Sequence, residues 1–493
     1  MNRIRINILL LLLCIFIPGV AQNVSDGWNK NRTARLTKPV FVYNNWSAYD
    51  ELSDNIPLDE ALAMKELDHI VRLKKLGVQV DYYMMDAFWF DVNEGYRKWR
   101  PDCWPEGPKR WLDACKREGI KPGLWFSTNL LRIGGEANTM RIIPEWESSV
   151  AEDGTTLCLF RGGYLHHLMQ TLQMYADMGI KMFKFDFAYF DAATPDAKCT
   201  MLPTDIEEQN KNAFISAIKE FRYRNPDVLF IGYNGFGGDM ENTVTPFRKT
   251  VDLRWLEIFD TMYCGDPRLS DVPMMNFWRS QDLYSDHMTF QYLFNGVPVR
   301  RIDNCAFMIG TTGTCYNRAL NAWKGMMILT MARGGWLNVC HGNIDLLSDD
   351  DARWVAKVQQ LYMKVQQYGS ISAFGAIPGK ALPYGYMASA EGGNLYTVVN
   401  ASQEKAKVML PEATGTGRVL FTDSGFMPVL EKNIVELGPE QMVVVGYGKF
   451  STREYDLGIE KDIVIPATIQ KYVTTNYPDA KILKIERDKK DYE

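Results

Sequence analysis

Short apolar runs alternate with longer amphipathic stretches along the first two thirds of the chain. The runs have the length and the Val, Ile and aromatic content of strands packed on both faces of a parallel sheet. Between them, apolar residues recur every three or four positions, as over 58–77 and 324–335, which predicts helices. The predicted strands are 39–44, 80–87, 121–127, 181–187, 228–234, 259–264, 297–303 and 336–340.

This alternation predicts a (β/α)8 TIM barrel over residues 38–370, because each strand is followed by a helix. A doubly wound open sheet is the alternative. However, the first predicted strand is not followed by the glycine-rich phosphate loop of such sheets. In a barrel, residues at the C-terminal ends of the strands face the substrate. Polar residues at those ends are therefore the first candidates for chemistry.

The pattern changes after a predicted helix at 349–369. Short runs of alternating apolar and polar residues, separated by Gly, Pro and Asn, predict an antiparallel β-sandwich over 371–450. The segment 451–493 is charged and predicts a short α+β tail. This tail resembles part of the small PepSY-like modules found on exported bacterial proteins.

The N-terminus has the pattern of an export signal at 1–21. Arg3 and Arg5 precede an apolar run, and small residues at 19–21 fit a cleavage site. The run is too short for a comfortable membrane span. Cys14 raises the alternative of lipid attachment, although Leu13 before it is bulkier than lipoprotein cleavage sites usually tolerate. We expect export to the periplasm, the cell surface or the medium.

Composition narrows the class of function. Hydrophobic residues make up 46% of the 493 residues and aromatic residues 12%, which suits a large core and flat faces that stack on sugar rings. The net charge of −5, without any Lys/Arg run, argues against nucleic acid and against a polybasic membrane surface. Nine cysteines less Cys14 leave eight, and none stands in a CxxC or a Cys/His cluster of metal-ligand spacing. We therefore expect no structural zinc, while disulfides remain open in an exported chain.

Acidic residues stand at the ends of three predicted strands. Asp86 ends the second, Asp186 stands in "KMFKFDF" at the end of the fourth, and Asp266 follows the sixth. The strand ends of a barrel converge on one mouth, so these carboxylates are expected to lie near one another. Hydrolysis of a glycosidic bond needs two carboxyl groups, one at the anomeric carbon and one that protonates the leaving oxygen. Strand-end carboxylates could meet this requirement, but among 60 acidic residues a pair of acids carries little information, so the sequence around them decides.

The segments around these acids resemble the barrel of the α-galactosidase superfamily, glycoside hydrolase families 27 and 36. The resemblance covers 38–345 and rests on "MMDAFWFD" at 84–91, on 96–127 with "KPGLWFS", and on "GIKMFKFDF" at 179–187. The family carries an acidic pair and Gly-Trp after strand two, Gly-Leu-Trp on strand three and Lys-x-Asp on strand four. The resemblance implies a (β/α)8 barrel and a retaining exo-α-glycosidase that needs no metal or organic cofactor.

Taken position by position, the resemblance implies roles for five residues. Asp186 is the nucleophile, and Lys184 donates to sugar hydroxyls. Asp86 binds hydroxyls of the terminal sugar, Trp89 matches the tryptophan after strand two, and Trp125 forms a stacking wall. The alternatives are structural, with Asp186 as a buried acid that balances Lys184 and Trp125 as part of the barrel core.

The general acid follows strand six in the family, in a Ser-Asp context. Asp266 in "CGDP" ends a predicted strand, whereas Asp282 in "WRSQD" is expected on the following helix, so strand-end geometry favours Asp266. Arg279 and Asp282 are then expected beside the substrate or as an ion-paired helix face. Asn234, at the end of strand five, is expected to donate to the substrate.

The chain departs from the family after strand two. Ala87 replaces the second acid of the pair and Phe88 the following Gly. We also expect none of the long N-terminal sandwich of family 36. Because a lost hydrogen-bonding acid changes which sugar a buried site accepts, galactose specificity is an open point.

The preferred interpretation is an exported α-galactosidase-like enzyme that removes terminal α-linked sugars from oligo- or polysaccharides by double displacement. One alternative is the same chemistry on another sugar, as in α-N-acetylgalactosaminidases or β-L-arabinopyranosidases. The other is a glycan-binding protein whose barrel has lost its chemistry. The oligomeric state and the linkage stay open.

Overall fold

The structure is a computed structural model of the chain. It describes residues 36–46, 48, 58–87, 89–133, 138–236, 251–264, 277–310, 322–423, 426–459, 467–478, 487–488 and 491–492. The predicted export signal, Phe88 and Asp266 lie outside the described residues. None of the helices within these ranges is long and apolar enough to cross a membrane.

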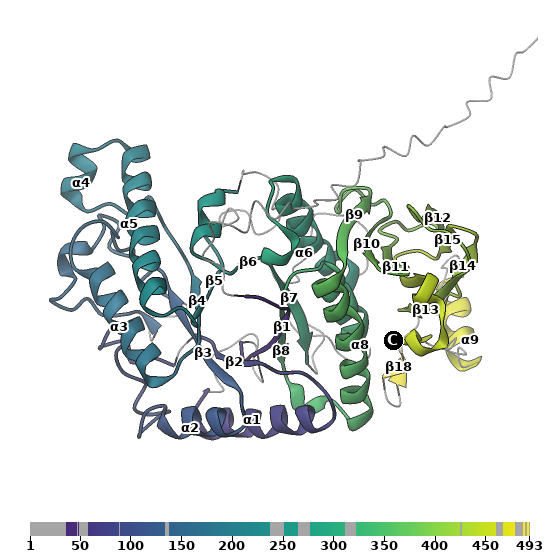
Figure 1. The fold of residues 1–493 in the computed structure, drawn as a ribbon, viewed down its shortest axis with the longest axis horizontal. Coiled ribbons are helices and arrows are strands. Elements are labelled where there is room, and N and C mark those ends of the chain that lie inside the picture. The colour runs from purple at the N-terminus through teal and green to yellow at the C-terminus, as the bar shows by residue number, and fades with distance from the viewer. Residues whose placement is uncertain are drawn as a thin grey trace, which may run out of the picture.

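Eight parallel strands of the described chain close into a barrel in sequence order, and β8 pairs with β1 to complete the ring (Figure 1). The predicted barrel is confirmed. The strands are β1 (Val40–Asn44), β2 (Tyr82–Met85), β3 (Lys121–Ser127), β4 (Met182–Asp186), β5 (Leu229–Gly232), β6 (Thr261–Tyr263), β7 (Ile302–Ile309) and β8 (Leu337–Gly342).

Helices surround the barrel. The side chain of Asp59 accepts from the backbone N–H of Leu62 and caps the first helix, while Ser348 and Asp351 form a capping box at the start of the last. The helices are α1 (Glu60–Lys75), α2 (Lys109–Arg117), α3 (Tyr164–Met178), α4 (Pro195–Thr200), α5 (Pro203–Arg224), α6 (Phe277–Phe294), α7 (Ala322–Ala332) and α8 (Asp349–Tyr368).

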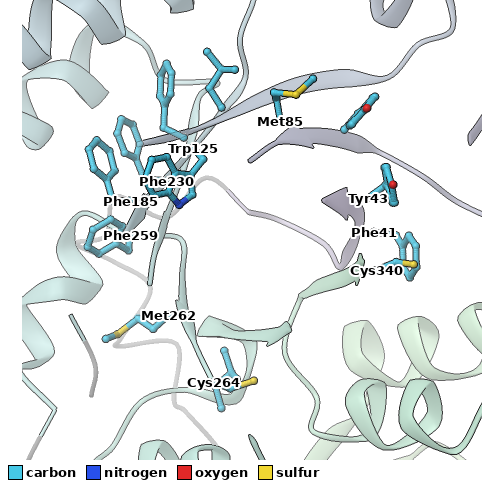
Figure 2. Packing of buried hydrophobic residues seen from close by; sticks show 14 of the residues in the cluster. Phe41, Tyr43, Met85, Trp125, Phe185, Phe230, Phe259, Met262, Cys264 and Cys340 are labelled. Atoms are coloured by element: carbon cyan, nitrogen blue, oxygen red, sulfur yellow. The ribbon is translucent and has the colours of Figure 1, made fainter. Parts of the chain in front are cut away.

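The strands send alternate side chains inward and outward. On β4, Phe183 and Phe185 belong to the cluster between the strands and the helices, whereas Met182 belongs to the cluster inside the barrel. Figure 2 shows Phe185 near Phe230 and Phe259, and its ring stacks on Phe230 with centroids 5.9 Å apart. Because side chains alternate with period two, residues 184 and 186 point inward with Met182. This alternation explains how Asp186 stands in an apolar strand.

The seventh strand lies later than predicted. Residues 299–301 of the predicted 297–303 form a 3-10 turn after Pro298, and β7 begins at Ile302. The strand was misplaced because its first residues include the fully buried polar pair Asp303 and Asn304. These polar residues interrupt the apolar run on which the prediction depended.

The chain after the barrel forms two sheets that are antiparallel except for the parallel pair β13 and β17, as the sandwich prediction requires. In the six-stranded sheet the order is β17-β13-β16-β11-β10-β9, and in the three-stranded sheet it is β12-β15-β14. Tyr384 and Tyr386 face the barrel cluster, whereas Met387, Tyr396 and Val398 face the three-stranded sheet. The strands are β9 (Ser370–Gly375), β10 (Tyr384–Ala390), β11 (Gly393–Val399), β12 (Ala406–Met409), β13 (Gly417–Thr422), β14 (Val429–Glu431), β15 (Ile434–Leu437), β16 (Met442–Tyr447) and β17 (Gly458–Ile459).

The described part of the tail contains the helix α9 (Ala467–Asn476) and the short pair β18 (Arg487–Asp488) and β19 (Asp491–Tyr492). The charged pattern thus predicted an α+β tail correctly, while the PepSY-like resemblance stays a prediction. Five of the described cysteines are unpaired thiols, namely Cys103, Cys115, Cys158, Cys199 and Cys340.

Candidate active site

Polar side chains follow apolar ones at the C-terminal ends of the barrel strands. The inner cluster holds apolar and tyrosine residues from the N-terminal parts of the strands, such as Val42 of β1, Met84 of β2 and Val339 of β8. Two residues further along each strand the sequence has a polar residue, and every one of these is buried. Together with Lys184 and Asp186 of β4, they are Asn44, Asp86 and His341. The mouth of the barrel is therefore polar and its floor apolar.

Asp186 is the last residue of β4 and is only 7% exposed. Its Oδ1 accepts from the side-chain amide of Asn234 (2.8 Å), from the backbone N–H of Asn234 (3.2 Å) and from that of Phe187 (2.9 Å). Its Oδ2 accepts from the indole N–H of Trp125 at 3.3 Å. Among the residues that the structure describes, Oδ1 thus has three donors and Oδ2 has one, so Oδ2 retains the greater capacity to bind a ligand.

Burial raises the pKa of Asp186, and the positive charge of Lys184 and the hydrogen bond from Asn234 oppose that shift. The nearby carboxylate of Asp86 raises the pKa further. Phe187, directly after Asp186, has φ of 47°, a left-handed conformation that is rare for a bulky residue. Strained backbone of this kind is concentrated at functional sites.

Lys184 and Asp86 form a buried ion pair that crosses the barrel interior. The distance from Lys184 Nζ to Asp86 Oδ2 is 2.7 Å, and the side chains are 4% and 2% exposed. The same Oδ2 accepts from the side chain of Asn44 at 2.9 Å. Lys184 Nζ also lies 4.0 Å from the ring centroid of Tyr233, an arrangement that stabilises the cation. The site thus offers one ammonium and one carboxylate, both held in place, beside Asp186.

A second carboxyl group lies behind Asp86. Glu66 of α1 is fully buried and accepts from the hydroxyls of Tyr43 and Tyr83. The side chain of Asn45 also bonds Glu66, and its Oδ1 accepts the backbone N–H of Asp86 at 2.8 Å. Burial raises the pKa of Glu66 to about 7. Nothing in the strand pattern indicates Glu66, because it stands on a helix among residues with ordinary amphipathic spacing.

The two tryptophans of the resemblance take different places. Trp125 contacts Asp186 through its indole N–H, so it lies at the site as expected. Trp89 is fully buried, and its ring packs against Trp99, Phe126 and Tyr175 in the outer cluster. Its indole N–H donates to the backbone carbonyl of Trp125 at 2.9 Å. Trp89 therefore supports β3 from behind, and the structure does not bring it to the site.

The strand-six side of the site is only partly described. Asp282 lies on α6, as predicted, and is 5% exposed. It stands one turn before Asp286 on the same helix face. Arg279 also lies on α6, but its side chain and the whole of Asp266 fall outside the described residues. Among the residues that the structure does describe, no three His, Cys, Asp or Glu side chains gather as a metal site would require.

The structure adds two residues to the site that the sequence analysis did not select. His341 of β8 is buried at the mouth, and its ring meets Trp46 edge-on with centroids 6.0 Å apart. Trp46 follows β1 in "YNNWS". His341 is the last but one residue of β8 and Trp46 stands two residues after β1, and these positions near strand ends were the available signal.

Comparisons with known proteins agree with this architecture. No protein-family model matches the chain. The α-galactosidase Mel36A of Lactobacillus acidophilus is 26% identical over 220 residues, which are 41% of this chain and 28% of that protein. The crystal structure of the family 36 α-galactosidase AgaA of Geobacillus stearothermophilus with raffinose is similar, with a TM-score of 0.55 and 14% identity. It covers 83% of this chain and 56% of AgaA.

A putative α-galactosidase of Bacteroides fragilis gives a TM-score of 0.53 at 15% identity, over 84% of this chain and 79% of that protein. The chain thus spans about a quarter of Mel36A and about half of AgaA. At identities this low the solved structures establish the fold. The expected fold is confirmed: the chain has a (β/α)8 barrel followed by a C-terminal β-sandwich, an arrangement similar to that of the solved α-galactosidases.

Proposed function

We propose that the protein is an exported, retaining, α-galactosidase-like exo-glycosidase that acts on terminal α-linked sugars of oligo- or polysaccharides. The observation that carries the proposal is the environment of Asp186, a buried acid at the mouth of the barrel. Among the described residues its Oδ1 has three hydrogen-bond donors and its Oδ2 has one, which leaves Oδ2 available for a ligand. The partial match to Mel36A supports the reaction class. Crystals of AgaA with raffinose and stachyose support an oligosaccharide as substrate.

In the proposed reaction, Oδ2 of Asp186 attacks the anomeric carbon as the bond to the leaving oxygen breaks. A carboxylic acid on the strand-six side gives its proton to that oxygen, and a glycosyl ester of Asp186 results. Water then attacks the same carbon, its proton passes to the carboxylate of the acid, and Asp186 leaves as a carboxylate. Lys184 and Asp86 bind hydroxyls of the sugar, and Trp125 orients Oδ2 while offering its ring face.

The acid in this scheme is Asp266, which follows strand six in the sequence. Asp282 is the weaker candidate, because it shares a helix face with Asp286, whose carboxylate binds Arg333 and two tyrosines. Asp271 is a third candidate, since Ser270-Asp271 has the Ser-Asp order that the resemblance attaches to the acid.

Substitution of each acid by Asn separates these candidates. The variant that lacks the true acid loses turnover of a disaccharide but keeps turnover of a dinitrophenyl glycoside, whose leaving group needs no proton. Azide then restores its rate and gives a glycosyl azide. We expect this behaviour from Asp266→Asn, and finding it in Asp271→Asn or Asp282→Asn instead would reassign the role.

The sugar specificity follows from the corner after strand two. Ala87 offers a methyl group where the family has a second acid, so one hydroxyl of galactose loses its partner. A related sugar that lacks or modifies this hydroxyl is therefore the second candidate substrate, as in the α-N-acetylgalactosaminidase or β-L-arabinopyranosidase alternatives.

A panel of nitrophenyl α- and β-glycosides tests the proposal with the mature protein and its Asp186→Asn variant. We expect release from an α-galactoside or from one of the two alternative glycosides, and loss of that release in the variant. Proton NMR of the first sugar released should show the anomer of the substrate. Binding of sugar by both proteins without any turnover would favour the glycan-binding alternative.

Export is tested separately by the N-terminus of the protein recovered from the producing cell. Cleavage after Ala21 would give a chain that begins at Gln22. A lipid-modified N-terminus at Cys14 would instead establish anchoring to a membrane surface.

A further inference from the structure

The six-stranded C-terminal sheet meets the barrel at one buried charged group. Asp286 of α6 accepts from Nε of Arg333, directly after α7, at 2.8 Å, and from the hydroxyl of Tyr386 on β10 at 3.0 Å. The hydroxyl of Tyr384 donates to its other oxygen. All four side chains are at most 1% exposed. We call these four residues the α6 anchor.

Two further contacts hold the same part of α6 to the sheet. The Nδ1 atom of His287 lies 2.8 Å from the carbonyl of Pro378, in the connection between β9 and β10. The ring of Phe290 meets Tyr384 and Tyr386 edge-on, at centroid distances of 5.9 and 5.7 Å. The contacts between the sheet and α6 therefore extend from residue 286 to residue 290, more than one helical turn.

From α6 a chain of contacts leads to the candidate site. The hydroxyl of Tyr292 donates to the backbone carbonyl of Tyr263, the last residue of β6, at 2.5 Å. The ring of Tyr263 stacks on Tyr233 with centroids 4.3 Å apart. Tyr233 also contacts Lys184, which holds Asp86. All the residues in this chain of contacts are buried.

A sheet that merely covered the barrel would need only apolar contacts there. Burying an ion pair gives little net stability, because desolvation offsets the attraction, and well-packed apolar residues often serve as well. Such a group instead determines orientation, because two hydroxyls and a guanidinium fix one orientation of the carboxylate. The α6 anchor is therefore better suited to setting the position of the helix than to adding stability.

We infer that the C-terminal sheet is a positioning element of the site. Through the α6 anchor it fixes α6, and α6 fixes the wall of Tyr263 and Tyr233 beside Lys184. Tyr384 and Tyr386 are thus positioning residues on a separate sheet that do not touch the site themselves. The inference rests on the proposed function for its effect on turnover, but not for its effect on the helix.

The test compares the Tyr384→Phe/Tyr386→Phe double variant with Tyr396→Phe, both in the full chain. Tyr396 is equally buried and its hydroxyl also donates a hydrogen bond, to the backbone carbonyl of Pro411, but it lies on the opposite face of the same sheet. We expect kcat/KM of the double variant at 25 °C, on the best substrate of the wild type, to fall about tenfold or more. The control should stay within about twofold of the wild type, whatever its Tm.

Hydrogen exchange of the α6 amides, followed by mass spectrometry without substrate, provides a readout that does not depend on activity. We expect faster exchange over 277–294 in the double variant and unchanged exchange in the control. A double variant with a lower Tm but unchanged kcat/KM and exchange would overturn the inference. If the wild type turns over no glycoside, the proposed function fails while the exchange result still decides the role of the sheet. Should the double variant not fold, the single Tyr386→Phe variant takes its place.

Discussion

Lys184 and Asp86 balance each other's charge inside the barrel. Removal of one partner leaves the other as an uncompensated buried charge, which destabilises the folded protein. Lys184→Met leaves Asp86 with only neutral donors among the described residues, the amide of Asn44 and the backbone N–H of Ala87, so we expect the free energy of unfolding to fall by about 3–5 kcal/mol. The Asp86→Asn/Lys184→Met double variant should recover a large part of this loss. Urea unfolding of the four proteins measures the coupling, and losses that simply add would show that the two residues act independently.

Glu66 introduces a pH dependence from behind the candidate site. Its pKa rises from 4.5 to about 7 on folding because the side chain is fully buried. The folded protein therefore holds this proton more tightly than the unfolded chain. The stability that results is complete below pH 4.5, decreases as the pH rises, and is lost above about 7, a change of about 3 kcal/mol.

The Glu66→Gln variant isolates this effect, since it keeps the shape of the side chain and removes the titration. We expect Tm of the wild type to fall more than that of the variant between pH 5 and pH 8. The comparison cancels the titration of all other groups. Parallel Tm profiles for the two proteins would mean that Glu66 is ionised throughout.

The sequence predicted single residues well where they stand at the ends of inward-facing strands. Asp186, Lys184, Asp86, Asn234 and Trp125 all lie together because strand position and period-two alternation determine where they point. Trp89 was misplaced because it follows the strand, where alternation no longer determines direction. Glu66 could be selected only after the fold was known.

Among the elements, the turn after β5 has the closest link to the nucleophile. Gly235 has φ of 97°, and a Cβ atom there would lie 2.3 Å from the carbonyl oxygen of Ala188. The close approach of Gly235 to Ala188 joins the turn after β5 to the chain just after β4. It thereby holds Asn234 where its backbone and side-chain N–H groups donate to Asp186. Glycine is thus required both for the backbone angle and for the approach.

We expect Gly235→Ala to shift Asn234 away from Asp186 and to lower kcat at least about tenfold. Gly107→Ala is the matched control, because Gly107 also has a positive φ, 66°, but no atom within 4 Å of the position of an added Cβ. Steady-state kinetics of the two variants at the same temperature gives the comparison. Equal kcat values would show that the loop accommodates the methyl group without moving Asn234.

Helix and strand boundaries followed the hydrophobic pattern where burial was apolar. The bounds of β3 agree with the predicted 121–127, and α8 ends one residue before the predicted helix. The pattern failed at β7, where Asp303 and Asn304 are buried in the strand itself. Buried polar residues carry no hydrophobic signal, so strands that contain them are the ones that sequence periodicity misplaces.

For the whole molecule, the two C-terminal units make different contributions. The six-stranded sheet shares the main core with the barrel, whereas described side chains of α9 such as Tyr472 are exposed. A chain that ends at Ile459 should therefore fold with Tm within about 2 °C of the full chain. A chain that ends at Gly369 should be insoluble, because it exposes the barrel surface that Tyr384 and Tyr386 cover. Soluble expression and thermal unfolding of both chains check this, and a stable barrel from the shorter chain would contradict it.

At this scale the sequence predicted which units exist but not how they are joined. The three partners of Asp286 in the α6 anchor stand 47, 98 and 100 positions from it in the chain, and each pattern in isolation is that of an ordinary helix or strand. Long-range polar contacts of this kind form only when three elements meet in the folded chain. The periodicity of hydrophobic residues within each element therefore cannot predict them.

The most direct test of the central claim, that Asp186 is the nucleophile, is covalent labelling with a galactose-configured cyclophellitol aziridine followed by peptide mass spectrometry. The epimer that suits the preferred sugar replaces it if the glycoside panel so indicates. We predict one label per chain, on the peptide that carries Asp186, and none on the Asp186→Asn variant. A label on a different carboxylate, or an active enzyme that takes no label and releases the inverted anomer, would contradict the account.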